Sequence, residues 1–310
     1  MISYSAPGKI ILSGEHSVVY TKPAFVTAVD FHLIFHINTV NSKSNATIDP
    51  AVLYCENIVA SYLRKNSITF TKRQYSYSIE STIPKGRGMG SSAAFCVAVV
   101  ASLLHFYTGK QYDKQIINSL AYQCEKYFHG NPSGVDVSTS CFGGLIFYRK
   151  EFEFLKTISS LNFKIPKSFQ DKMILIDTGK PEESTSEMIS YVGKRYNLYP
   201  KKTERVLSDI ERVTKRMVVG VVKEDIKMFT QAIEENQKLL VELGIVSKKT
   251  ISLLESLKPY GVGKVTGAGG LKKGSGMMIF IINYPQVKQE VMKLFTYTEF
   301  NQNHSGIVCL

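Results

Sequence analysis

The sequence lacks the patterns that mark several classes of protein. Its cysteines are odd in number and widely scattered, so no pair or quartet has the spacing of a zinc site. We therefore expect free thiols in a reducing, cytoplasmic compartment. No internal repeat and no low-complexity tract is present, and the tail is not a prenylation box, because Cys309 is second from the end.

No signal peptide and no membrane span are expected. Residues 1–9 do not contain a charged segment followed by an apolar one. The longest nearly apolar run, Ala93–Leu104, contains Ser102 and is too short to cross a bilayer, which takes about 20 residues.

The bulk composition is that of a globular protein, with 44% hydrophobic and 21% charged residues. This excludes disorder, collagen and coiled coil as descriptions of the whole chain. A length of 310 residues predicts two domains or one large one. The unusual feature is a net charge of +12, from 38 Lys+Arg against 26 Asp+Glu. It indicates an anionic partner: nucleic acid, an acidic membrane surface or a phosphorylated small molecule.

Hydrophobic periodicity predicts strands and helices interspersed in both halves of the chain, so each half is expected to be α+β. The polar stretch 159–168 is the candidate boundary, which gives domains 1–160 and 161–310. The expected strands are 9–13, 24–28, 33–38, 75–82, 144–148, 153–157, 173–177, 263–266 and 276–282, and 41–50 is an expected loop. The expected helices are 51–65, 91–107, 115–128, 187–196, 203–220, 225–243 and 247–258.

A first glycine motif lies between an expected strand and an expected helix. Gly86, Gly88 and Gly90 alternate just before Ser91 and Ser92. Glycine lets a ligand approach the main chain closely, and a helix N-terminus attracts anions. The serines could cap the helix, bind phosphate or ligate Mg²⁺. The segment is neither a Walker loop nor a dinucleotide fingerprint, and a plain glycine-rich turn with a serine cap is the alternative.

Two further segments carry candidate chemistry. Lys9, Glu15 and His16 surround one expected strand and its exit, where surface charges beside a turn are the simpler interpretation. Glu125 lies in the last turn of an expected helix, and a Gly/Asn/Pro turn separates that helix from Asp136. Paired carboxylates can hold Mg²⁺ and accept a proton, but an ordinary helix end followed by an Asx-type turn is an equal alternative.

Together and in this order, the three segments resemble those of the GHMP small-molecule kinases. The strings are APGKIILSGEHSVVY at 6–20, PKGRGMGSSAA at 84–94 and EKYFHGNPSGVD at 125–136; IDTG at 176–179, with Ser184-Thr185 beyond it, and KVTGAGG at 264–270 support them. The SVVY that follows GEH, and the HGNPSG before Asp136, are most similar to the mevalonate kinase branch. The matches extend over almost the whole chain.

The resemblance implies a two-domain fold and an activity. The expected fold has an N-terminal ribosomal-protein-like α/β domain and a C-terminal ferredoxin-like α+β domain, with the active site in the cleft between them. The expected activity is transfer of the γ-phosphoryl group of ATP to the 5-hydroxyl of mevalonate, with Mg²⁺, in isoprenoid precursor synthesis. A cytoplasmic enzyme without a nucleic-acid or membrane partner is implied, and a homodimer is left open.

The resemblance also assigns residues. Asp136 would be the general base or orienting carboxylate, and Lys9 would stabilise the developing alkoxide. Ser92 and Glu125 would hold Mg²⁺. The ATP phosphates and nucleotide would contact Ser81, Gly86, Arg87, Gly88, Met89, Gly90, Ser91 and Ser92. The substrate pocket would include Glu15, His16, Thr185, Thr266, Gly267 and Ala268.

The last glycine loop departs from the family pattern. Mevalonate kinases usually continue it as an unbroken run of glycines, whereas here Gly270 is followed by Leu271-Lys272-Lys273. One hypothesis is that Lys272 or Lys273 supplements phosphate or carboxylate binding. A solvated loop tip is the simpler interpretation.

Other functions remain open from the sequence. Phosphomevalonate kinase, an archaeal-type mevalonate 3-kinase and homoserine kinase share the fold and the first glycine motif. A non-catalytic sensor on the same fold is disfavoured because Lys9, Glu125 and Asp136 are all present. Nucleic-acid binding is disfavoured because the basic residues are spread through the chain rather than clustered.

Overall fold

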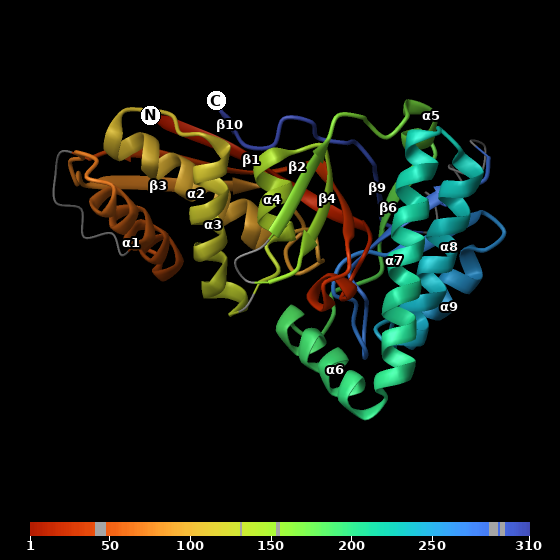
Figure 1. The fold of residues 1–310 in the computed structure, drawn as a ribbon. Helices are drawn as coiled ribbons and strands as arrows, with labels where there is room; N and C mark the ends of the chain where they lie inside the picture. Colours follow the sequence, from red (N-terminus) through yellow and green to blue (C-terminus); the bar gives the residue numbers. More distant parts are fainter. Residues whose placement is uncertain (41–47, 131, 153–155, 285–290, 292–294) are drawn as a thin grey trace.

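Two antiparallel sheets organise the chain in the computed structural model, which describes residues 1–40, 48–130, 132–152, 156–284, 291 and 295–310. The first sheet has the order β10-β1-β2-β4-β5, with β3 also paired to β2, and the second has the order β7-β8-β6-β9. Helices cover both sheets (Figure 1). The expected α+β organisation of both halves is confirmed. Most of the expected loop 41–50, Asn131 and part of the expected strand 153–157 lie outside the described residues.

The first sheet is built around two long strands that pair along their length. Its strands are β1 (Ile2–Ser13), β2 (Ala24–Thr39), β3 (Tyr75–Ser81), β4 (Leu145–Lys150), β5 (Lys156–Leu161) and β10 (Val308–Cys309). The two strands expected over 24–38 are one strand, β2, which spans two neighbours: its start pairs with β4 and its end with β3. Polar Asp30 interrupts the hydrophobic pattern at the midpoint, where the β1–β2 register shifts at Pro7/Gly8.

The helices of the first half are α1 (Pro50–Lys65), α2 (Ser91–Thr108), α3 (Lys114–His129) and α4 (Val135–Phe142), and a short 3₁₀ helix, η1 (Ser17–Tyr20), follows β1. α2 packs on β1 and β2, with α1 and α3 beside it. Among the described residues α2 is the one helix long and apolar enough to cross a membrane, but 72% of it is buried inside the fold. Its apolar character is that of a core helix.

The second half carries α5 (Lys167–Gln170), β6 (Met173–Asp177), α6 (Thr185–Leu198), α7 (Pro200–Val222), α8 (Ile226–Leu243), α9 (Lys248–Leu257), β7 (Gly261–Val265), β8 (Met277–Ile282) and β9 (Tyr297–Glu299). Local signals explain several starts. Ser184 and Glu187 form a reciprocal capping box before α6, and the carboxylate of Asp225 accepts from the Met228 amide at the start of α8.

The two halves of the chain are not divided at a single position in the sequence. Residues 159–161, expected in a linker, belong to β5. The last strand, β10, returns to pair with β1, so the two chain ends lie close together (Figure 1). A cut at 160/161 would therefore leave a strand of the first sheet on the second fragment, and the division into 1–160 and 161–310 stays a proposal.

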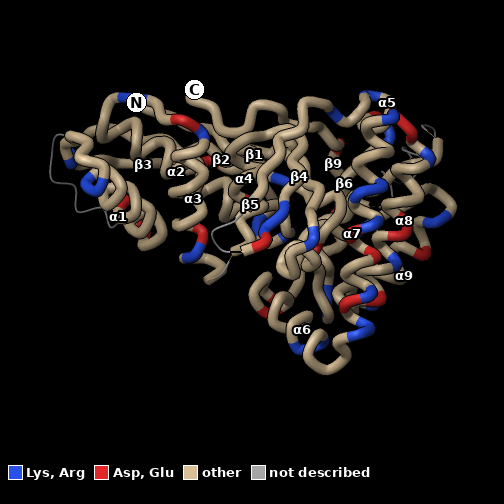
Figure 2. Tube along the Cα trace, in the orientation of Figure 1, with Lys and Arg blue, Asp and Glu red and all other residues tan. Residues whose placement is uncertain are grey.

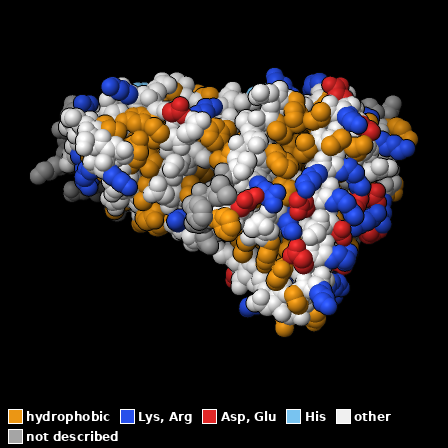
Figure 3. All heavy atoms as spheres, in the orientation of Figure 1, with side chains coloured by type: hydrophobic (Ala, Val, Ile, Leu, Met, Phe, Trp, Pro, Cys, Tyr) orange, Lys and Arg blue, Asp and Glu red, His pale blue; other side chains and the backbone are white. Residues whose placement is uncertain are grey.

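Basic and acidic residues are interleaved on the helices of the second half, on the face shown in Figures 2 and 3. On α7, Arg205 pairs with Asp209 and with Glu242 of α8, and Arg216 pairs with Glu235. These exposed or half-exposed ion pairs neutralise charge locally and contribute little to stability. Much of the basic charge on this face therefore has an acidic neighbour and does not form one continuous basic surface.

Candidate active site

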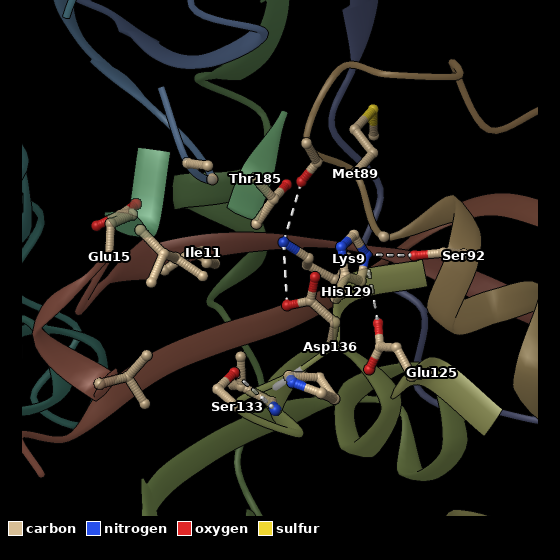
Figure 4. A pocket seen from close by; sticks show the side chains of 18 of the residues that line it. Lys9, Ile11, Glu15, Met89, Ser92, Glu125, His129, Ser133, Asp136 and Thr185 are labelled. Atoms are coloured by element: carbon tan, nitrogen blue, oxygen red, sulfur yellow. Dashed lines mark hydrogen bonds and ion pairs between the residues drawn. The ribbon is translucent and has the colours of Figure 1, made fainter. Parts of the chain in front are cut away.

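A cavity of about 280 Å³ lies where the two halves meet. Its wall combines β1 and its exit, the glycine loop (residues 84–92), the end of α3, the start of α4, the start of α6 and residues 267–268 (Figure 4). Most of the residues selected from the sequence line it: Lys9, Glu15, His16, Gly86, Gly88, Met89, Gly90, Ser91, Ser92, Glu125, Asp136, Thr185, Gly267 and Ala268. Segments from opposite ends of the chain thus form one site.

The glycine loop adopts a backbone that other residues resist. Gly86, Gly88 and Gly90 have φ of 68°, 77° and 75°, in the left-handed region that costs a side chain about 1–2 kcal/mol. The loop is also close to its neighbours, because a Cβ on Gly90 would lie 2.9 Å from Cγ of Lys9. α2 begins at Ser91 with no side-chain cap, so its first N–H groups are free to bind an anion.

Lys9 and Asp136 form the centre of the cavity (Figure 4). Nζ of Lys9 lies 3.2 Å from Oδ1 of Asp136 and donates a hydrogen bond of 3.0 Å to the carbonyl of Gly88. The lysine is buried, whereas 29% of the Asp136 side chain is exposed. Asp136 lies in the first turn of α4, where the helix N-terminus stabilises a carboxylate. The arrangement suits a base that faces a ligand while a cation stands beside it.

Glu125, Ser92 and His129 form a second group on the same wall (Figure 4). Oγ of Ser92 and Nε2 of His129 share a hydrogen bond of 3.0 Å, and the same nitrogen is 4.0 Å from Oε1 of Glu125. Glu125 is 2% exposed, and its Oε2 has no hydrogen-bond partner. Burial, and to a smaller extent the neighbouring Asp136 charge, raise the pKa of Glu125 to about 8.

These residues fit a magnesium ion that is partly coordinated by a ligand. A buried carboxylate oxygen without a partner is costly, and a divalent cation would both satisfy it and favour its ionised form. No group of three or more His, Cys, Asp or Glu suited to a metal occurs among the described residues. Because Mg²⁺ typically takes one or two protein ligands and completes its shell with phosphate and water, Glu125 and Ser92 would suffice as its protein ligands.

The exit of β1 makes buried contacts with the second half. His16 Nε2 lies 2.9 Å from the carbonyl of Ala268, and burial lowers the pKa of His16. The Glu15 carboxylate pairs with Nζ of Lys264 on β7, and neither side chain is exposed. Glu15 therefore lies in the cavity wall with one oxygen already engaged by a cation.

Some residues selected from the sequence lie elsewhere. Arg87 pairs with Asp177 on β6, at 2.7 Å, and does not line the cavity. Ser81 is exposed at the end of β3 and accepts from the Ile83 amide. Thr266 is buried, accepts from the Ile11 amide at 2.7 Å and lines an adjoining pocket instead.

The basic loop tip also lies outside the cavity. Lys272 and Lys273 are exposed and lie 3.6 and 2.8 Å from the two carboxylate oxygens of Glu182. This placement favours the simpler interpretation, that of a solvated loop tip.

Two residues of the site are not among those selected from the sequence. In the sequence, His129 is only one member of the motif at 125–136. It stands one helical turn after Glu125, which indicates that the two residues share a face of the helix. Lys264 lies inside an expected strand, and a single lysine in a short strand usually points to solvent. Only its tertiary contacts with Glu15 and Ile11 show that it is buried.

Comparisons with known proteins find similarity to GHMP kinases. The family model described as "GHMP kinases N terminal domain" matches residues 53–144. The mevalonate kinase of Pyrococcus abyssi is 27% identical over 303 residues, which cover 87% of this chain and 86% of the relative. The mouse mevalonate kinase is 26% identical and covers 93% of this chain and 88% of its own length.

Solved structures share the fold over almost the full length. The Methanococcus jannaschii mevalonate kinase has a TM-score of 0.78 at 22% identity and covers 97% of this chain and 98% of its own. The L. major mevalonate kinase in complex with R-mevalonate has a TM-score of 0.72 at 21% identity, covering 93% and 89%. The Streptococcus pneumoniae phosphomevalonate kinase, in complex with phosphomevalonate and AMPPNP, has a TM-score of 0.75 at 16% identity and covers all of both chains.

Proposed function

We propose that the chain is a GHMP kinase, as its family-model match, curated relatives and solved neighbours support, and that it transfers the γ-phosphoryl group of ATP to the 5-hydroxyl of mevalonate. The placement of Lys9 between Asp136 and the glycine loop carries this proposal. The mevalonate kinases among its relatives, and the R-mevalonate bound to one structural neighbour, support the choice of substrate.

The nucleotide would bind along the glycine loop. Left-handed glycines and the uncapped start of α2 present N–H groups to its phosphates. The ATP analogue in the phosphomevalonate kinase neighbour supports a nucleotide site in this fold. Arg87 would act from outside the cavity, through its ion pair with Asp177, which ties the glycine loop to β6.

Glu125 and Ser92 would hold Mg²⁺, with the nucleotide phosphates as its other ligands. When bound, the ion neutralises charge on the phosphates that are transferred and released. The chain's own contribution is a carboxylate whose second oxygen has no other partner and a hydroxyl oriented by His129.

Asp136 and Lys9 would carry out the proton transfer. The substrate oxygen attacks the γ-phosphorus, its proton passes to the Asp136 carboxylate, and the bond from phosphorus to the ADP oxygen breaks. The Lys9 ammonium stabilises negative charge on the attacking oxygen. Because the Lys9 amine is also hydrogen-bonded to the glycine loop, it is fixed relative to both reactants.

The lining of the cavity suits mevalonate better than its phosphorylated analogue, which carries more negative charge. Lys9 is the one Lys or Arg among the described lining residues, and it is committed to Asp136. A substrate that carried its own phosphate would leave that charge without a basic side chain. The remaining wall includes apolar side chains that can pack on a methyl group: Ile11, Val18, Val19, Val135 and Ile189.

A panel assay of ADP release tests the proposal. The purified protein is given ATP, Mg²⁺ and, in separate reactions, mevalonate, 5-phosphomevalonate, homoserine or galactose. Turnover with mevalonate at least a hundredfold above that with the other acceptors is expected. Strong turnover with another acceptor and none with mevalonate would overturn the assignment. We further propose a cytoplasmic location, which the free and mostly buried cysteines support.

A further inference from the structure

Lys264 is a buried lysine whose donors are fully used. It lies on β7 of the second sheet with no exposed surface. Its Nζ donates to the Glu15 carboxylate, to the carbonyl of Ile11 at 3.2 Å and to the carbonyl of Val265 at 2.8 Å. An ammonium group has three N–H donors, so each has an acceptor, and two of the acceptors belong to the first half of the chain.

Burying this ion pair to join two parts of the fold costs free energy. Desolvation raises the pKa of Glu15 and lowers the pKa of Lys264, because burial disfavours both charges. Oε2 of Glu15 has no partner. Replacing a buried ion pair by apolar residues of similar volume is often neutral or stabilising. Stability alone therefore does not account for the pair.

The segments joined by the pair are those that form one wall of the cavity. Next to it, the Ile11 amide donates to Oγ1 of Thr266, and His16 contacts the carbonyl of Ala268. The intervening Gly267 lies against the glycine loop, since a Cβ placed on it would be 3.2 Å from Cα of Gly88. A shift of β7 relative to the exit of β1 would move this wall relative to the glycine loop.

We infer that Lys264 is a positioning residue. Through its contacts with Glu15 and the Ile11 carbonyl, it holds residues 266–268 in the position required for productive substrate binding. The inference rests on the proposed function, because the substrate is taken to occupy the cavity. It assigns Glu15 a role in positioning the cavity wall rather than in direct binding of the substrate. It also explains why two opposite charges are buried at a junction that apolar side chains could fill.

The decisive variant replaces both partners. Lys264→Met alone leaves the Glu15 carboxylate buried without a counter-ion, so its melting temperature should fall steeply and its activity would be uninformative. Glu15→Gln combined with Lys264→Met removes both charges at nearly constant volume. We expect this double variant to melt within a few degrees of the wild type. Its kcat/KM for mevalonate should nevertheless fall at least tenfold, with the KM for ATP changed less than threefold.

The matched control is another buried bridge between the halves. Oγ of Ser13 and Oγ1 of Thr214 share a hydrogen bond of 2.7 Å, and neither residue lines the cavity. Ser13→Ala with Thr214→Val should change the melting temperature but leave kcat/KM for mevalonate within twofold of the wild type.

A second readout does not depend on the substrate. The Thr266 amide donates to the Met277 carbonyl, and the Gly270 amide donates to the Ile245 carbonyl, so both should be protected from hydrogen exchange. Exchange at residues 266–270 should be at least tenfold faster in the charge-free double variant and unchanged in the control.

The outcomes separate the inference from the proposed function. A double variant with wild-type kinetics and wild-type exchange would show that the pair is only structural and would overturn the inference. If the wild-type protein phosphorylates a different panel substrate, the proposed function fails, and the kinetic comparison is made with that substrate. If it phosphorylates none of them, the exchange of residues 266–270 decides the inference by itself.

Discussion

Nζ of Lys9 stands 3.2 Å from Oδ1 of Asp136, and the same nitrogen reaches the carbonyl of Gly88 in the glycine loop. One buried cation therefore links the candidate base to the loop that would hold the nucleotide. The two side chains come from β1 and from α4, which are separated by most of the first half of the chain.

Because Lys9 and Asp136 are proposed to act on the same oxygen, the effects of their removal should not be additive. Asp136→Asn and Lys9→Met should each lower kcat by about a hundredfold or more, and the double variant should be little worse than either single one. The KM for ATP should change much less. Steady-state kinetics of all three variants measure this. Lys238→Met is the control, because Lys238 is an exposed partner of Glu234 on α8. Losses that multiply in the double variant would show that the two residues act independently.

Replacing Glu125 should change how the melting temperature depends on pH. Its pKa is raised to about 8 in the folded protein, against about 4.3 in an unfolded chain. The folded state therefore binds the proton more tightly, and the stability that this supplies is present at pH 4 and is lost as the pH rises toward and through 8. Without metal, the melting temperature of the wild type should fall from pH 5 to pH 8.5 more than that of Glu125→Gln.

At pH 8, nucleotide and Mg²⁺ should change the melting temperatures of the two proteins by different amounts. They should stabilise the wild type, whose carboxylate gains a partner, more than Glu125→Gln. Thermal melts at both pH values, with and without Mg²⁺ and a non-hydrolysable ATP analogue, provide the measurement. Parallel pH profiles for the two metal-free proteins would contradict the raised pKa of Glu125.

Alanine at Gly88 should weaken ATP binding as well as the fold. Gly88 has φ of 77°, and an added Cβ would lie 3.1 Å from the carbonyl oxygen of Thr266. Gly109 provides a matched control, because its φ is 72° and a Cβ added there would have no neighbour within 4 Å. Both substitutions carry a left-handed strain of about 1–2 kcal/mol. We expect Gly88→Ala to lose more stability than Gly109→Ala and to raise the KM for ATP at least tenfold.

Denaturant unfolding and initial rates of the two alanine variants test this expectation. Equal stability losses, with an unchanged KM for ATP in Gly88→Ala, would show that the loop can move away from Thr266 and still bind the nucleotide.

The two lysines of the C-terminal glycine loop should be dispensable for catalysis. Lys272 and Lys273 are exposed and pair with Glu182 outside the cavity, and exposed ion pairs contribute little. The double variant Lys272→Ala/Lys273→Ala should keep both KM values within twofold of the wild type at ordinary ionic strength. A rise of more than fivefold in either KM would support the alternative hypothesis, that these lysines supplement phosphate or carboxylate binding.

Local sequence signals were sufficient to predict most of the helices and strands. The ends of α1, α6 and α8 follow from capping residues and hydrophobic periodicity, and the strand over 173–177 was predicted with the bounds that β6 has. α4 was missed because it is only eight residues long and follows a turn rich in Gly, Asn and Pro. β10 was missed because a two-residue strand has no pattern of its own and exists only through its pairing with β1.

By itself, the sequence predicted the glycine loop, the candidate base, its lysine and the proposed magnesium ligands, because each is carried by a short motif whose chemistry depends on neighbouring residues. Only the tertiary structure decided where long side chains point. Arg87 turns away from the cavity to Asp177, and Lys264 is buried against Glu15 rather than exposed. The physical reason is that such ion pairs join residues far apart in the chain, and their existence depends on how the two sheets pack together.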